Sequence, residues 1–305
     1  MAQFTKMIPV AALLTGATVW GLIWYPYRVL AAAGIGGAVA TTATYAGALA
    51  LGVVWLRPRL HVSWMLLAIA LAAGWANVGF TMAVVYGDVM RVVLLFYLAP
   101  IWTIVFARWL LGERLAGAGY ALMGLALAGA AVMLWHPQLG WPVPRTLAEW
   151  TGLSAGAMFA LSNVLIRKTP QLAIELKVLA VFFGGIVAGT ACILAIPSVD
   201  LPWTPTLDNV LLLAVLAVVL LTVNVAVQYG LTHISANRAI VIYLFELVVT
   251  AISAWLLAGE ILTLREWVGG AMIVAAGLLS DRLAETRAYD LSACSTTAPG
   301  RRSRG

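Results

Sequence analysis

Charged side chains are scarce in this chain of 305 residues: only 10% of them are charged, whereas 63% are hydrophobic. A soluble globular domain carries roughly 25% charged residues. So few charges cannot cover a water-facing surface of this size, which excludes a soluble enzyme and a disordered protein. The composition therefore predicts an integral membrane protein.

Cysteine is almost absent, and so are the motifs of several enzyme classes. Cys192 lies in an apolar run and Cys294 in a polar tail, so they offer neither a disulfide framework nor the spacing of a metal site. The sequence has no glycine-rich phosphate loop ending in Gly-Lys-Ser/Thr, the motif of an ATP-driven machine. We therefore expect no metal and no other cofactor.

Long apolar runs, separated by polar residues or by proline and glycine, predict ten transmembrane helices. A helix needs about 20 mainly apolar residues to cross a bilayer, and the alternating pattern of barrel strands is absent. We expect an all-α integral membrane fold with spans at residues 7–28, 37–56, 63–86, 90–111, 116–135, 147–168, 176–196, 207–231, 237–258 and 266–283.

The distribution of Lys and Arg predicts the orientation of these helices. Basic residues gather in cytoplasmic loops, and a cytoplasmic N-terminus places 14 of the 18 basic residues inside. Only Arg28, Arg91, Arg145 and Arg265 then lie outside. We expect both termini in the cytoplasm of a bacterium, with the chain in its inner (plasma) membrane. The net charge of +6 then marks topology rather than a nucleic-acid partner.

An internal duplication is the most informative feature of the sequence. A shift of 139 residues places Arg28 on Arg167. A shift of 147 residues superposes three further pairs: Asn77 on Asn224, Arg91 on Arg238, and Gly112-Glu113 on Gly259-Glu260. We predict a first repeat over residues 1–140, a second over 141–285, and a disordered cytoplasmic tail over 286–305.

Each predicted repeat holds five crossings, and an odd number gives the two copies opposite orientations. Inverted repeats are a transporter architecture, in which the two halves exchange conformations so that a central site opens alternately to either side. The alternative is that the duplication only builds a stable bundle. We favour two inverted five-helix repeats around a central cavity.

Several motifs resemble the drug/metabolite transporter superfamily, specifically its ten-helix EamA-type exporters. In the first half they are LFYLAPIW at 95–102 and ARWLLGERL at 107–115. In the second half they are YLFEL at 243–247 and AWLLAGE at 254–260. The family often has Glu-Pro in its ninth helix, whereas here Leu247 follows Glu246 and the proline is Pro100 of helix four.

The resemblance implies a secondary transporter that exports small metabolites, most often amino acids, and one branch of the family exports aromatic ones. Its partners would be a small-molecule substrate and the lipid bilayer, with the proton as a candidate coupling ion, in a monomer or homodimer. A multidrug or quaternary-cation exporter of the same fold is the first alternative. An intramembrane enzyme is the second, although no convergent nucleophile, base or metal set supports it.

One acidic residue, Glu246, lies near the middle of an apolar run. Charged groups at this depth are costly and usually face a cavity, so Glu246 is a candidate to bind a substrate ammonium group or the coupling proton. A buried, protonated Glu that bonds a neighbouring helix is the alternative.

Further candidates are amides and aromatic rings in the same set of helices. Amides can bind an amino acid or simply join membrane helices, and aromatic faces attract apolar groups and cations or anchor a helix at the membrane surface. The candidate substrate-binding residues are Asn77, Asn163, Asn224, Gln228, Trp20, Trp24, Tyr45, Tyr97, Trp102 and Tyr243.

Pro100, Arg91 and Arg238 are candidates for conformational roles. Pro100 lacks a backbone donor and is expected to kink helix four, either as a gate or as a packing feature. Arg91 and Arg238 are expected at opposite mouths of the bundle, as gates or as basic anchors at helix ends.

Overall fold

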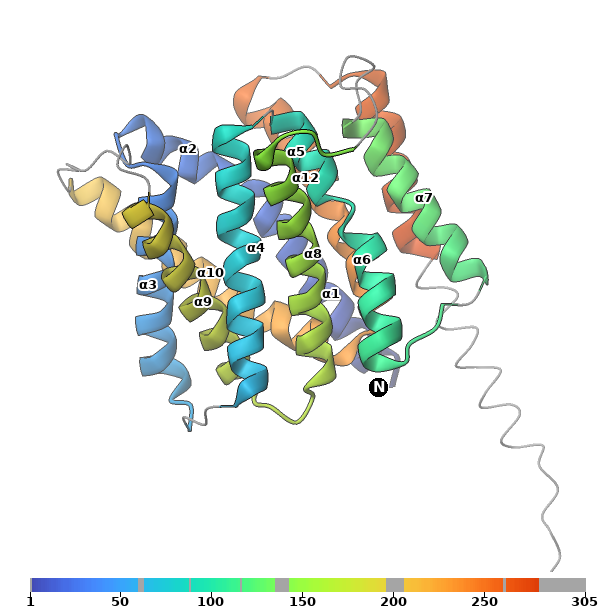
Figure 1. The fold of residues 1–305 in the computed structure, drawn as a ribbon, viewed down its shortest axis with the longest axis horizontal. Helices are drawn as coiled ribbons and strands as arrows, with labels where there is room; N and C mark the ends of the chain where they lie inside the picture. The colour runs from blue at the N-terminus through green and yellow to red at the C-terminus, as the bar shows by residue number, and fades with distance from the viewer. Residues whose placement is uncertain are drawn as a thin grey trace, which may run out of the picture.

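The computed structural model describes residues 2–59, 63–87, 89–115, 117–134, 143–195, 206–259 and 262–279, and these ranges contain helices and no strand. Figure 1 shows the bundle that they form. The helices are α1 (Ala2–Leu22), α2 (Trp24–Ala32), α3 (Gly37–Leu56), α4 (Trp64–Tyr86), α5 (Val89–Phe96), α6 (Ala99–Phe106), the π-helical turn η1 (Ala107–Leu111), α7 (Gly117–Leu134), α8 (Leu147–Lys168), α9 (Ile174–Ala195), α10 (Leu207–His233), α11 (Ala236–Tyr243), α12 (Phe245–Ala258), and an unlabelled helix over 264–279.

The expected all-α membrane fold is confirmed. In the described residues, eight helical stretches are long and apolar enough to cross a membrane. Helix α8 and the helix over 264–279 lie at the other two predicted spans, so the count of ten is roughly consistent with the structure. The predicted span 147–168 coincides with α8, because Thr146 accepts a hydrogen bond from Glu149 N and caps the helix at its first turn.

Helix α8 lies in the middle of the view in Figure 1. It packs against α4, α5, α6, α10 and α11. The lack of a side chain at Gly152 and Gly156 lets α8 approach Val92 and the backbone of Phe96 in α5. Because one side of α8 packs against these helices rather than lipid, it tolerates buried polar residues such as Asn163.

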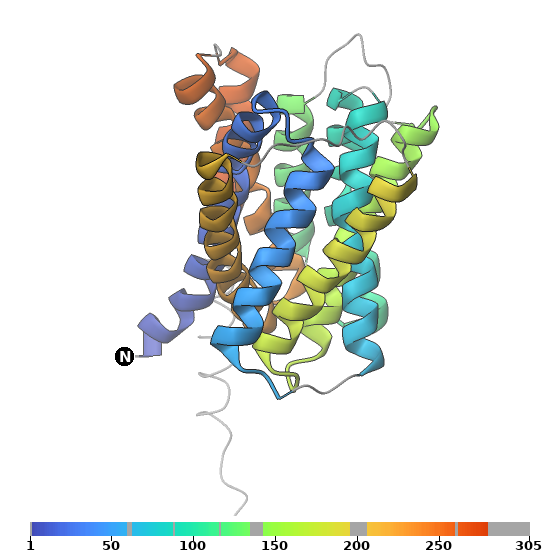
Figure 2. The ribbon, with the colours of Figure 1, turned by 90° about the vertical axis from the view of Figure 1, so that its left-hand side faces the viewer.

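Helices α3, α4 and α9 form a second tightly packed group, seen together in Figure 2. Gly184 of α9 faces the backbone carbonyl of Ala70 in α4, while Gly74 faces the backbone of Gly184. Small residues let membrane helices approach at backbone distance, where van der Waals packing holds them. This crossing fixes the side of the bundle away from α7 (Figure 1).

The described residues include three discontinuous crossings: one breaks at Ile23, between α1 and α2, and the breaks of the other two correspond under the 147-residue shift. Of these two corresponding breaks, one separates α5 from α6 at Tyr97 and Leu98, and the other separates α11 from α12 at Leu244. Both crossings also end in a left-handed glycine, Gly112 and Gly259, each with φ of 69°. Glycine adopts this conformation without strain, so it ends a helix well.

The two asparagines that correspond in the repeat, Asn77 and Asn224, make the same type of hydrogen bond. Asn77 Nδ2 donates to the carbonyl of Ala73, and Asn224 Nδ2 donates to the carbonyl of Leu220, each one turn back along its own helix. These correspondences support the duplication. The proposed boundary at residues 140 and 141 and the tail over 286–305 lie outside the described residues, so those limits stay predictions.

Each end of the bundle has an ion pair that joins the two halves of the chain. At one end, Arg91 of α5 pairs with Glu149 of α8 over 2.8 Å. At the other end, Glu113 pairs with Arg167 over 3.6 Å. We call these the Arg91 end and the Arg167 end. The Arg167 end is the lower one in Figure 1, where α8 turns into α9.

Candidate functional site

Glu246 lies directly after a helix break, in the first turn of α12. Its carboxyl group and the hydroxyl of Tyr97 are within hydrogen-bonding reach of each other. The phenol of Tyr243, the last residue of α11, is close enough to interact electrostatically with the same carboxyl group. The α5–α6 and α11–α12 breaks therefore bring one acidic and two phenolic groups together, one group from the first half of the chain and two from the second.

A continuous set of aromatic contacts joins the two tyrosines that flank Glu246. The ring centroids of Tyr97 and Phe96, of Phe96 and Phe159, and of Phe159 and Tyr243 are each 5.6 Å apart. Phe80 adds a further contact with Phe96 at 4.7 Å. Such spacing is typical of favourable aromatic pairs. We call these five rings the aromatic wall.

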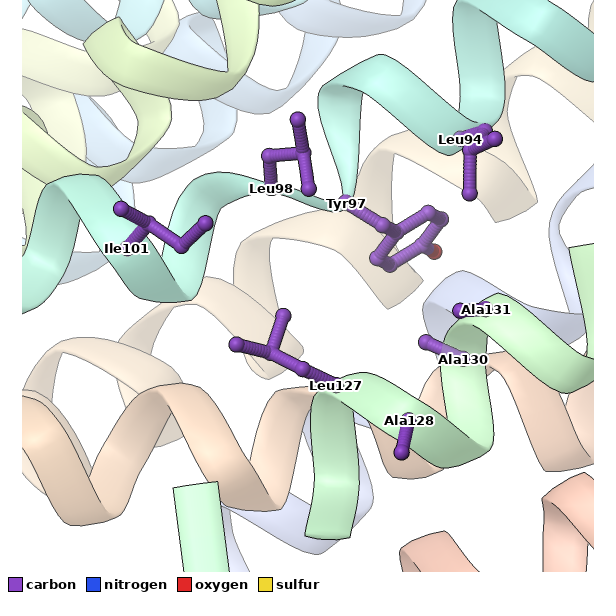
Figure 3. A pocket seen from close by; sticks show the side chains of 8 residues that line it. All are labelled: Leu94, Tyr97, Leu98, Ile101, Leu127, Ala128, Ala130 and Ala131. Atoms are coloured by element: carbon purple, nitrogen blue, oxygen red, sulfur yellow. The ribbon is translucent and has the colours of Figure 1, made fainter. Parts of the chain in front are cut away.

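A pocket of about 270 Å³ lies between the α5–α6 break, which interrupts the fourth crossing, and helix α7 (Figure 3). It is lined by Leu94, Tyr97, Leu98, Ile101, Leu127, Ala128, Ala130 and Ala131. The Tyr97 hydroxyl is the one polar side-chain group of this lining, so the chemistry suits an apolar substituent. Tyr97 belongs both to this pocket and to the surroundings of Glu246.

The structure places three of the predicted residues, Trp20, Tyr45 and Asn77, in a separate group, and it places Trp24 against α12. Tyr45 donates to Asn77 Oδ1 over 2.8 Å between α3 and α4, and Trp20 packs against the cluster that contains Tyr45. Trp24 Nε1 donates to Ser253 Oγ over 2.9 Å. Ser253 is two turns along α12 from Glu246. The Trp24 contact holds the start of α2 against α12, the helix that carries Glu246.

The remaining amides are buried between α8 and α10. Asn163 is 7% exposed, Asn224 4% and Gln228 2%. The amide nitrogen of Asn224 donates a hydrogen bond to the carbonyl of Leu220 in its own helix. Asn163 Nδ2 and Gln228 Oε1 have no hydrogen-bond partner among the described residues.

The candidates for conformational roles lie at breaks and helix ends. Pro100 is buried in the first turn of α6, immediately after the break in the fourth crossing, where proline is well tolerated. Trp102 stacks on Phe106 with ring centroids 6.2 Å apart. Arg238 is half-buried in α11, and Arg91 pairs with Glu149.

Three kinds of site residue escaped the sequence analysis. Phe80, Phe96 and Phe159 were not distinguished from other apolar residues, because their helices are apolar on most faces. Glu149 was not recognised as the partner of Arg91, because 58 residues separate them along the chain. No proline lies near Leu244, so the sequence did not predict a helix break there.

Comparison with known proteins agrees with this architecture. The discontinuous crossings, with an acidic residue at one of the breaks, are the features of a transporter. Residues 146–280 match the model of the EamA-like transporter family, which is part of the drug/metabolite transporter superfamily. The expected resemblance to this family is thereby confirmed, and it indicates a membrane transporter of small molecules.

A solved structure confirms the fold over nearly the whole chain. It is described only as the crystal structure of a protein, and it matches with a TM-score of 0.74 and 18% sequence identity. The match covers 91% of this chain and 98% of that one. At such low identity the likeness concerns the fold alone. No curated protein matches the chain significantly.

Proposed function

We propose that this protein exports amino acids with aromatic or hydrophobic side chains across the bacterial inner membrane by alternating access. The observation that carries this proposal is the position of Glu246 between Tyr97 and Tyr243, beside an apolar pocket that shares Tyr97. One end of the site is acidic and the other is hydrocarbon. An amino acid with an apolar side chain matches both ends.

In this proposal Glu246 binds the substrate ammonium group, and the phenols of Tyr97 and Tyr243 complete its hydrogen bonding. A carboxylate at this depth needs such partners, because an unpaired charge in an apolar surrounding is costly. The apolar side chain of the substrate occupies the pocket between α6 and α7. The aromatic wall contributes ring contacts and attraction for the cationic group.

The breaks in the fourth and ninth crossings supply the motion. Helix breaks leave backbone groups outside the regular ladder, and such backbone is tolerated in a membrane where it lies in protein or faces a cavity. The segments α5 and α6, and likewise α11 and α12, can therefore change their mutual angle at Tyr97–Leu98 and at Leu244. Movement at both breaks would expose the Glu246 site to one end of the bundle and then to the other.

The proposal is tested by counterflow in liposomes that contain the purified full-length protein. Liposomes loaded with unlabelled L-phenylalanine should accumulate labelled L-phenylalanine, whereas those loaded with L-aspartate should not. Glu246→Gln should reduce this flux at least about tenfold, the size of one lost hydrogen bond to a charged group. Wild-type protein without flux of any aromatic or aliphatic amino acid would contradict the proposal.

The aromatic wall around a carboxylate also suits a quaternary cation, which makes a cation exporter the second candidate. Competition separates the two candidates. A quaternary phenethylammonium ion should inhibit L-phenylalanine counterflow weakly if the substrate carboxylate is recognised. Equal or stronger inhibition by the quaternary ion would favour the cation exporter.

A further inference from the structure

Three buried amide side chains each keep one polar atom without a partner among the described residues. They are Asn163 of α8, Gln228 of α10 and Asn237 of α11, which are 7%, 2% and 4% exposed. The spare atoms are the nitrogen Nδ2 of Asn163 and the oxygens Oε1 of Gln228 and Oδ1 of Asn237. Buried polar atoms nearly always have partners, so three exceptions on three helices that contact one another need an explanation.

The register of the helices places Asn163 and Gln228 at one level. Near their C-terminal ends, α8 and α10 meet where Arg167 Nη1 donates to the carbonyl of Thr232. Asn163 lies one turn before Arg167, and Gln228 lies one turn before Thr232. Because both helices meet at their C-terminal ends, they run in the same direction, and the two amides lie one turn deeper in the bundle.

Asn237 lies in the first turn of α11, next to Ala236 at the Arg167 end, and α11 packs against both α8 and α10. Phe159 lies one turn before Asn163 in α8, on the side away from Arg167. Its ring contacts Tyr243, which lies beside Glu246. Asn163 and Gln228 therefore lie between the Glu246 site and the Arg167 end, and Asn237 lies at the Arg167 end itself.

A layer of polar contacts closes the Arg167 end beyond Asn163 and Gln228 and beside Asn237. Glu113 Oε1 pairs with Arg167 Nε over 3.6 Å, and Glu113 Oε2 accepts a hydrogen bond from Ala236 N over 3.1 Å. Lys177 Nζ, which is fully buried, donates to Thr232 Oγ1 over 3.0 Å and to the Ile166 carbonyl over 3.1 Å. The side chains of Arg167 and Glu113 are 31% and 21% exposed, so this layer forms the rim of the bundle.

We propose that Asn163, Gln228 and Asn237 form a second binding subsite, for the charged groups of an amino acid that passes between Glu246 and the Arg167 end. The spare nitrogen of Asn163 can donate to a carboxylate, and the spare oxygens of Gln228 and Asn237 can accept from an ammonium group. The contact of Glu113 with Arg167 and Ala236 is the barrier that closes this subsite. The inference rests on the proposed function, because it takes the same substrate class.

Amide-to-leucine variants test the subsite. In liposomes, Asn163→Leu and Gln228→Leu should each slow L-phenylalanine counterflow about tenfold, because each loses a hydrogen bond to a charged group. Binding of L-phenylalanine, measured by thermal shift, should stay within about twofold of wild type, because Glu246 is retained. Thr222→Val, an exposed position of α10, is the matched control and should leave both measurements unchanged.

Each other outcome overturns the subsite. Unchanged flux, or a lower melting temperature with unchanged flux per folded protein, would assign the amides a structural role. Flux and binding lost to the same extent would make them part of the Glu246 site. Wild-type protein without flux or binding would overturn the proposed function itself, and the subsite with it.

The barrier has its own test through thiol labelling. In a background with Cys192→Ala and Cys294→Ala, Gln228→Cys in nanodiscs should react slowly with a membrane-impermeant maleimide. Adding Glu113→Gln should raise the labelling rate several-fold, and L-phenylalanine should then slow the labelling. A labelling rate that changes neither with Glu113→Gln nor with L-phenylalanine would contradict the proposed barrier.

Discussion

Arg91 in α5 holds both carboxylate oxygens of Glu149 in α8, with Nε to Oε1 at 2.8 Å and Nη2 to Oε2 at 3.0 Å. Glu149 also accepts a hydrogen bond from Arg145 N over 2.8 Å, and Arg91 donates to the carbonyl of Val143. The side chains of the pair are only 11% and 5% exposed. A bidentate pair with this geometry fixes the start of the fourth crossing on the start of the sixth.

Loss of one partner of this pair should strongly destabilise the protein. Glu149→Gln is expected to lower the free energy of unfolding by about 3 kcal/mol, because it leaves the Arg91 guanidinium buried without its counter-charge. Unfolding by denaturant in detergent, followed by tryptophan fluorescence, measures this change. Asp208→Asn, at an exposed position, is the control. Equal stability of the two variants would show that the pair contributes little.

The crossing of α4 and α9 should not accept a larger residue at Gly184. A methyl group there would overlap the backbone carbonyl of Ala70, which cannot move without shifting the whole helix. Gly184→Ala should therefore lower the free energy of unfolding by at least about 2 kcal/mol. A Cβ on Gly124 in α7 would meet no atom within 4 Å.

Gly124→Ala is the matched comparison for this prediction. Because alanine favours a helix over glycine, this substitution should raise stability by about 0.5 kcal/mol. The two variants have the same chemical change and differ in their surroundings alone. If Gly184→Ala melts at the wild-type temperature, the close backbone approach of α4 and α9 is wrong.

The hydrogen bond between Trp24 and Ser253 should show energetic coupling between the first and ninth crossings. Trp24 Nε1 donates to Ser253 Oγ over 2.9 Å. In a double-mutant cycle with Trp24→Phe and Ser253→Ala, the coupling is expected to be about 1 kcal/mol. The melting free energies of the four proteins give this value. Coupling near zero would mean that the two residues act independently.

The sequence predicted the number and limits of the helices well, because the apolar runs are long and their ends carry clear signals. Gly112 and Gly259 are examples: both end a crossing in the left-handed conformation, and both were found as counterparts in the repeat. The two asparagines, Asn77 and Asn224, likewise make the same backbone hydrogen bond. Local features that each half repeats are visible in a single sequence.

The site was less predictable, because it depends on which helix face meets which neighbour. Glu246 could be selected by its depth alone. Its relation to Tyr97 depends on how two breaks, 147 residues apart, meet in space, and the break at Leu244 occurs without a proline. Phe159 joins the aromatic wall because α8 packs against both α5 and α11. In a helix that is apolar on most faces, the hydrophobic pattern does not predict which neighbour an aromatic ring contacts.

Aromatic contacts at Phe159 should affect substrate preference more than stability. Phe159→Leu keeps most of the buried apolar area but removes the ring contacts with Phe96 and Tyr243. We expect a loss of about 1 kcal/mol in the preference for L-phenylalanine over L-leucine, the size of one aromatic pair. Competition in the counterflow assay measures this ratio. An unchanged ratio would place Phe159 outside the substrate contacts.

Glu246 should determine any pH dependence of exchange, if it alternates between the substrate ammonium group and a proton. The side chains that face it are the phenols of Tyr97 and Tyr243, which ordinarily stay neutral near neutral pH. Residues 7–22 of α1, which packs against α12, contain no ionisable side chain. The helix over 264–279 approaches α12 where Gly270 faces Val248.

Glu246→Gln replaces this carboxyl group with a neutral amide of nearly the same shape, which cannot exchange a proton. Wild-type counterflow should differ between acidic and neutral buffers, because protons and substrate compete for one carboxylate. The residual flux of Glu246→Gln should be the same in both buffers, while Tyr97→Phe should keep the wild-type pH profile at a lower rate. If Glu246→Gln retains the wild-type profile, the proton binds elsewhere, and Glu246 serves the substrate alone.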